Sequence, residues 1–162
     1  MRSFTRNRCT SVEQSDERTI RSSCRLQDTL IDASVQIEVK LPDLEVACVT
    51  GSITRSLCRE EIDVEATLQK VVGIRVGPGM KKIIKGVMGE GGVRGQLALM
   101  VEECCSAVIL SFTKDVLRKR PKEKTEEREF YAKMVRENPR LYNRCAAYAP
   151  GSSLVEGMDP PE

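Results

Sequence analysis

The chain has 162 residues, enough for one domain with a substantial core, and its hydrophobic content of 40% and charged content of 31% are those of a soluble globular protein. A formal net charge of +2 and an aromatic content of 4% exclude both the strongly basic surface and the base-stacking platforms that nucleic-acid-binding proteins use. The chain contains no histidine, which excludes histidine-dependent triads, histidine general bases and histidine-ligated zinc.

An alternation of apolar and polar residues predicts β-strands in the first third of the chain. Residues 19–26 and 35–41 both follow a period of two, with one polar face. Pro42 begins a turn signal, after which residues 44–50 resume the alternation. We therefore expect the last two segments to form a hairpin beside the first, in an antiparallel sheet of three or more strands within about residues 18–55.

From Asp63 onward the apolar residues recur with a helical period. Asp63 is a candidate N-cap for a first helix that we expect to end just before Gly73. A second helix is expected to end at Gly89. The longest helix is expected at about residues 95–120, and apolar side chains surround most of it, which is typical of a helix at the centre of a fold.

The last part of the chain is less regular. Residues 122–128 are a charged segment that we expect to be solvated, and a short amphipathic helix follows and stops before Pro139, so that helices span about residues 63–137. Strands followed by helices predict an α+β fold, with a small antiparallel sheet packed against three to four helices. We expect one domain over residues 1–149 and a loosely ordered tail over residues 150–162.

Eight glycines lie between residues 73 and 97. They do not form a Walker A loop, and the third glycine that a dinucleotide fingerprint needs after Gly77 and Gly79 is replaced by Lys82. Two interpretations remain. The turn opens a helix whose backbone N–H groups, with Lys81 and Lys82, bind a small anion, or the glycines only delimit helices.

Two carboxylates and one cysteine are the candidate reactive groups. Glu102 and Glu103 lie on the expected central helix, where a buried carboxylate would serve as an acid or base; the alternative is an exposed polar stripe. Cys58 precedes the helix that begins near Asp63 and is followed by Arg59, a setting that favours a nucleophilic thiolate or a metal ligand.

The seven cysteines are odd in number and form no C-x-x-C pair, which is typical of reduced, mostly buried thiols in a cytosolic protein. Cys104 and Cys105 project about 100° apart on a helix and suit neither a disulfide nor one shared metal ion. The first residues lack the apolar run of a signal peptide, and the apolar region 97–112 contains two glutamates. We therefore expect a cytoplasmic protein that does not span a membrane.

Several segments resemble an uncharacterised bacterial family that is known as a domain of unknown function. They are LQKVVGIRVGPGM at 68–80, GGVRG at 91–95 and NPRLYNRCAAYA at 138–149, and with LQDT at 26–29 the resemblance covers most of residues 18–155. The resemblance implies no established activity.

The family pattern implies a cysteine before the first helix, which Cys58 matches, and a Gly-Cys-Thr-His-Leu-like stretch after the glycine turn. This chain has Gly95-Gln96-Leu97-Ala98-Leu99 there, so both the cysteine and the histidine are absent, and a metal site built on them would be lost. The order of sheet, cysteine, helix and long acidic helix is also similar to the layout of iron–sulfur cluster assembly scaffold proteins, whose last cysteine would fall near Gln96.

These features favour a non-catalytic accessory, binding or scaffold protein that takes a protein partner or a small anionic ligand and needs no cofactor. One alternative is an enzyme or small-molecule binder with a pocket between sheet and helices that uses Cys58, or Glu102 and Glu103. The other is an iron–sulfur or metal-handling protein. Neither nucleic acid nor a membrane is an expected partner, and an exposed strand edge or apolar helix face would make a homodimer natural.

Overall fold

A computed structural model describes residues 4–57, 61–114, 118–119, 121 and 123–159 of the chain. The chain forms two compact units, Met1–Val108 and Ile109–Glu162. The division of the sequence into one domain over 1–149 and a tail from 150 stays a prediction, because compactness alone does not establish which segments fold independently.

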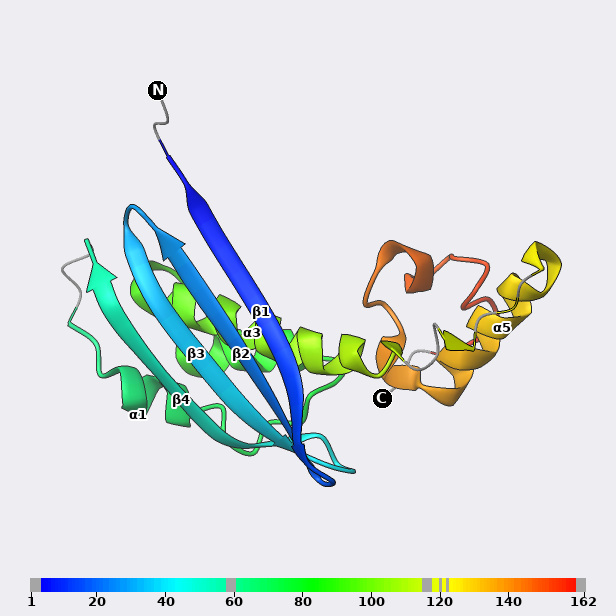
Figure 1. Ribbon diagram of the computed structural model, residues 1–162, viewed down its shortest axis with the longest axis horizontal. Coiled ribbons are helices and arrows are strands. Elements are labelled where there is room, and N and C mark those ends of the chain that lie inside the picture. The colour runs from blue at the N-terminus through cyan, green and yellow to red at the C-terminus, as the bar shows by residue number, and fades with distance from the viewer. Residues whose placement is uncertain (1–3, 58–60, 115–117, 120, 122, 160–162) are drawn as a thin grey trace. The chain divides into compact units, whose positions relative to one another are not determined.

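The first unit contains a four-stranded antiparallel sheet, as Figure 1 shows. Its strands follow the chain order and are β1 (Arg6–Asp16), β2 (Thr19–Asp28), β3 (Ile31–Lys40) and β4 (Glu45–Ser56). The predicted α+β fold, with its antiparallel sheet in the N-terminal part and its helices, is confirmed. Strand β1 was missed because it is an edge strand with almost no buried residues, so its sequence has no apolar alternation.

The inner face of the sheet consists of the apolar set that the alternation predicts. In β3 every second side chain from Ile31 to Val39 is buried, and β2 shows the same pattern from Ile20 to Leu26. The outer face is polar, and serines pair across neighbouring strands on it: Ser11 with Ser23 at 2.8 Å, and Ser34 with Ser52 at 3.1 Å. The sheet therefore has one face for a helical layer and one face for solvent.

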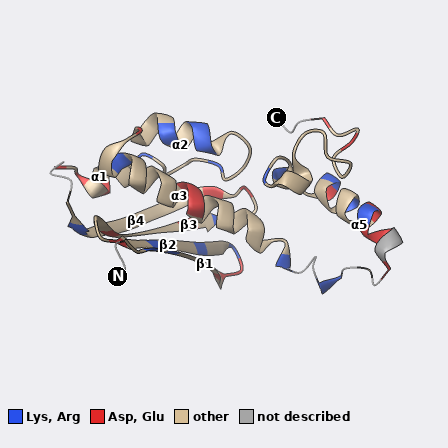
Figure 2. Cartoon of the chain, turned by 90° about the horizontal axis from the view of Figure 1, so that it is seen from above, with Lys and Arg blue, Asp and Glu red and all other residues tan. Residues whose placement is uncertain are grey.

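Three helices of the first unit, α1 (Val64–Gln69), α2 (Met80–Met88) and α3 (Gly92–Ser111), lie on one face of the sheet, as Figures 1 and 2 show. The predicted N-cap of α1 is confirmed, since the Asp63 carboxylate accepts a hydrogen bond from the Ala66 N–H at 2.9 Å. The helix is shorter than predicted because the chain turns through Gly73, whose φ is 85°, and returns to β4. There the N–H groups of Gly73 and Val46 bond to Val46 O and Ile74 O at 2.8 and 3.0 Å.

Helix α2 ends at Gly89 as predicted, but α3 is shifted from the predicted range of 95–120. It begins at Gly92, since the Gly95 N–H already bonds to Gly91 O at 2.8 Å. It ends at Ser111, where the Thr113 N–H and hydroxyl both donate to Leu110 O and tighten the last turn. The apolar pattern continues past this point, which is why periodicity placed the end of the helix too late.

The second unit contains α5 (Lys124–Glu137) and two short 3₁₀ turns, η1 (Pro139–Leu141) and η2 (Ala146–Tyr148). Most of the segment predicted to be a solvated charge run is the first part of α5, whose acidic residues Glu126 and Glu127 suit a helix N-terminus. Among the described residues of the whole chain, no helix combines the length and apolar character that crossing a membrane requires.

A buried aspartate holds the β2–β3 turn and the start of β1. Asp28 accepts hydrogen bonds from the Leu30 and Ile31 N–H groups at 2.7 and 2.8 Å and from Arg6 Nε at 2.7 Å. The carboxylate side chain is fully buried. Burial alone would raise the pKa of Asp28, but the hydrogen bonds from Ile31, Arg6 and Leu30 outweigh it and lower that pKa below its usual value.

We expect Asp28→Asn to lower the free energy of unfolding at neutral pH. Because the pKa of Asp28 is lower in the folded chain than in the unfolded one, its stabilisation is present above about pH 4 and is lost as the pH falls through the folded pKa. Urea unfolding from pH 7 to pH 2.5 should show the gap between wild type and variant closing in acid. Asp43→Asn, at an exposed carboxylate, is the control and should change stability by less than about 0.5 kcal/mol.

Two glycines give a second prediction, because alanine should lower the free energy of unfolding at one of them and raise it at the other. A Cβ at Gly51 would lie 2.7 Å from both Leu68 Cδ1 and the backbone oxygen of Ser34, so Gly51→Ala should destabilise the chain by about 2 kcal/mol. A Cβ at Gly86, within α2, would meet nothing within 4 Å, and Gly86→Ala should stabilise the helix by about 0.5–1 kcal/mol. Equal effects of the two changes in chemical denaturation would contradict the close packing of α1 on β4.

Candidate functional site

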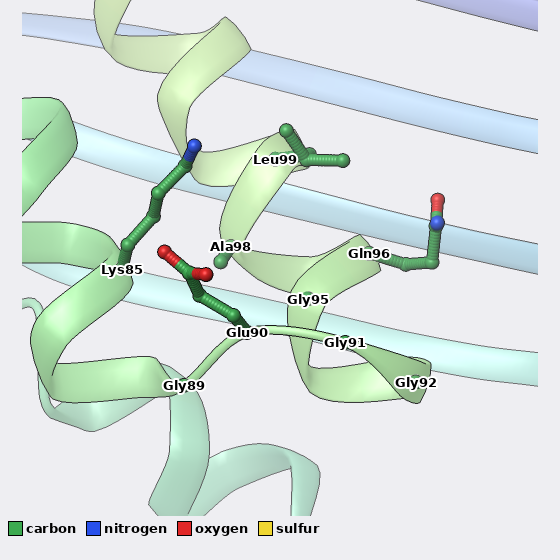
Figure 3. A pocket seen from close by; sticks show the side chains of 9 residues that line it. All are labelled: Lys85, Gly89, Glu90, Gly91, Gly92, Gly95, Gln96, Ala98 and Leu99. Atoms are coloured by element: carbon green, nitrogen blue, oxygen red, sulfur yellow. The ribbon is translucent and has the colours of Figure 1, made fainter.

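A small hollow lies where α2 turns into α3, and Figure 3 shows it from close by. Its volume is about 240 Å³. The chain can turn this sharply because Gly89 and Gly91 have φ values of 93° and 85°, which side chains with a Cβ rarely adopt. The wall is formed by nine residues: Lys85, Gly89, Glu90, Gly91, Gly92, Gly95, Gln96, Ala98 and Leu99.

Three polar side chains lie at this hollow, each from a different element. Lys85 comes from the last turns of α2, and Glu90 reaches back from the loop toward the Lys85 side chain, as Figure 3 shows. Gln96 comes from the first turns of α3 and extends on the other side. A concave, glycine-walled surface with a few polar side chains in its lining can take a small ligand.

The glycine turn that was predicted as an anion site opens α2. Gly79 has a φ of 78° and is the N-cap of α2, and its carbonyl accepts hydrogen bonds from the Lys82 and Ile83 N–H groups at 3.1 and 3.3 Å. Lys81 and Lys82 are exposed. Delimiting helices is therefore a confirmed role of these glycines, and anion binding at Gly77, Gly79, Lys81 and Lys82 stays a prediction.

The neighbouring carboxylates Glu102 and Glu103 have different surroundings. Glu103 is partly exposed, and its Oε1 lies 3.3 Å from Arg8 Nη2 in β1. Glu102 is only 7% exposed, and its Oε1 is buried without a hydrogen-bond partner. Glu102 is therefore a buried carboxylate and Glu103 a partly exposed one, and a role of either as an acid or base stays a prediction. Because Glu102 follows Ala98 by four residues, it lies one helical turn further along the side of α3 that lines the hollow.

The predicted nucleophile Cys58 lies outside the described residues. The six described cysteines are all free, and three of them (Cys24, Cys104 and Cys105) are buried. Within the described residues, no group of three or more Cys, Asp and Glu side chains is placed to hold a metal ion.

No protein-family model matches this chain, and neither a curated protein nor a solved structure matches it. Its candidate site therefore has to be argued from its own residues.

Sequence reasoning missed Glu90, although it examined the glycines beside it. The spacing of glycines at 89, 91, 92 and 95 between two apolar helical segments was the available signal, since closely spaced glycines at a helix–helix corner leave room that side chains would fill.

The Oε1 atom of Glu102 is buried without a hydrogen-bond partner, and this leads to a prediction about stability. Glu102→Gln removes a buried charge without changing the shape of the side chain, and we expect it to raise the free energy of unfolding by about 1 kcal/mol at pH 7. Glu103→Gln is the matched control, because it breaks only a partly exposed ion pair and should cost less than about 1 kcal/mol. A loss of stability in Glu102→Gln would show that the carboxylate has a compensating partner.

Proposed function

We propose that this chain is a non-catalytic binding protein that takes a small ligand with an anionic group in the hollow between α2 and α3. The observation that supports this most is the hollow itself, which is walled by glycines at the start of a 20-residue helix and has Lys85 and Gln96 on different sides of its lining. Lys85 supplies the charge that attracts an anion, and the glycines let the ligand approach the backbone closely.

The size and charge of the site limit the ligand. At about 240 Å³ the hollow is smaller than the 300–1,000 Å³ typical of drug-sized ligands, which favours a small metabolite over a nucleotide. The Glu90 carboxylate beside Lys85 disfavours a ligand that is only an anion, because like charges repel. A small molecule that carries an anionic group together with a hydrogen-bond donor or an amine suits both side chains.

The resemblance to the bacterial family of unknown function supports the same location. Its Cys and His positions correspond to Gln96 and Ala98, which line the hollow, so the proposed ligand site would be where that family keeps polar side chains. An iron–sulfur function gains no support from this hollow, because its lining contains no cysteine. A protein partner, a homodimer and a cytoplasmic location stay predictions.

The test is binding of small charged metabolites to the purified chain. A panel of amino acids, small dicarboxylates and phosphorylated sugars is screened by thermal shift, and a bound ligand at 100 times its Kd should stabilise the chain by roughly 2.7 kcal/mol. Lys85→Met should abolish the shift, and Ala98→Leu should abolish it by filling the hollow. Lys82→Met removes an exposed lysine that is not part of the lining and is the matched control.

Two outcomes would count against the proposal. One is a panel that leaves the wild-type unfolding temperature unchanged. The other is a ligand whose shift survives in Lys85→Met and Ala98→Leu, because its site would then lie elsewhere.

A further inference from the structure

Two buried thiols meet between the sheet and α3, away from the hollow. Cys24 lies on the inner face of β2 and pairs with Val35 of β3, and Cys104 of α3 lies against that same Val35, so the two thiols are neighbours. They are 1% and 0% exposed. The Cys104 sulfur also lies 3.9 Å from the backbone oxygen of Val35, to which it donates. Both thiols are reduced in this structure.

The surroundings of the pair are polar for a protein core. Thr10 of β1 is the cross-strand partner of Cys24. The Ser22 hydroxyl is fully buried beside Cys104, and its oxygen has no hydrogen-bond partner of good geometry. A buried hydroxyl without a hydrogen-bond partner lowers the stability of the fold. The Ser22 hydroxyl also places a proton donor beside the thiol pair, which packing of the core does not require.

The two cysteines lie near the edge of the sheet, because β2 is the neighbour of the edge strand β1. An ion pair between β1 and α3 lies beside them. Arg8 and Thr10 lie on the same face of β1, and Glu103 directly precedes Cys104 on α3. Arg8 Nη2 and Glu103 Oε1 are 3.3 Å apart, and the two side chains are 49% and 41% exposed. Ion pairs this exposed contribute little stability, so they open readily and admit a small molecule.

The electrostatics favour one thiolate in the pair. The hydrogen bond from Cys104 lowers the pKa of Cys24 to about 7, against the effect of burial. The hydrogen bond with Cys24 and burial both raise the pKa of Cys104. The other charged groups near the pair oppose one another, since Arg8 lowers the pKa of Cys24, and Glu103 raises it. One nucleophilic thiolate beside one protonated thiol is the arrangement of a reactive dithiol.

We propose that Cys24 and Cys104 are a redox-active thiol pair that hydrogen peroxide oxidises to an internal disulfide joining β2 to α3. The Cys24 thiolate attacks one peroxide oxygen, and the O–O bond breaks to give a sulfenic acid on Cys24 and a hydroxide, which takes a proton to become water. The Cys104 thiol then attacks the sulfenic sulfur, an S–S bond forms, and a second water leaves. The two thiols lose two electrons and the peroxide gains them.

The arrangement also explains which cysteines take part. Cys9, Cys48 and Cys145 are exposed. Cys105 is buried but projects about 100° away from Cys104 around α3, so it does not point to Cys24. Cys24 and Cys104 both lie beside Val35, and their sulfurs have to approach to about 2.05 Å to bond. Such a bond would be reversible by cellular thiols.

The test treats the fully reduced chain with hydrogen peroxide and maps every cysteine by mass spectrometry without reduction. We expect a Cys24–Cys104 disulfide that forms about tenfold faster than oxidation of exposed Cys48, since the thiolate is the reactive form. The rate should rise with pH around a midpoint near the Cys24 pKa of about 7. Dithiothreitol should restore both thiols.

Variants separate the pair from the other thiols. Cys104→Ser should leave Cys24 at the sulfenic acid, which a dimedone probe traps, and Cys105→Ser should form the disulfide at the wild-type rate. The proposal is overturned if Cys24 and Cys104 stay reduced while exposed cysteines oxidise, or if their disulfide appears only in urea. Because these two readouts use the wild-type chain, they hold even where a variant fails to fold.

Discussion

Burial of the apolar inner face of the sheet is the constraint on which the rest of the first unit depends. Strands β2 and β3 supply alternating buried side chains, and the sheet is covered by helices on that face only. Helix α3 contributes to this burial, since residues such as Leu97, Val101 and Val108 are almost fully inaccessible. Each buried aliphatic side chain of this size contributes about 1.5–3 kcal/mol, which is why a helix apolar on nearly all sides is retained here.

The placement of α3 also explains where the chemistry lies. The start of the helix forms a wall of the glycine hollow, and its middle presents Glu102, Glu103 and Cys104 in three directions. Glu103 meets β1, Cys104 meets β2, and Glu102 lies on the side of the hollow. Three consecutive residues therefore have three different environments, and their sequence proximity says nothing about a shared role.

The sequence predicted the structure correctly where residues close together in the chain determine it. Period-two alternation predicted β2, β3 and β4, and the Asp63 cap and Gly89 predicted helix ends, because these signals are local. It failed for β1, which is held by a backbone ladder and polar contacts, and for the end of α3, where Thr113 rather than a change in hydrophobicity stops the helix. The thiol pair joins segments far apart in sequence, and the hollow depends on the path of the turn between α2 and α3; hydrophobic periodicity records neither.

The weak burial of β1 has a consequence for how the unit opens. This strand contributes few apolar side chains, so detaching it costs its ladder of backbone hydrogen bonds and the contacts of Arg6 and Arg8, while the core of β2, β3 and α3 stays packed. Opening of β1 would leave the other three strands paired and would expose the edge of the sheet beside Cys24. Because β1 has no buried apolar face, a local opening of this one strand is enough to bring solvent to that edge of the sheet.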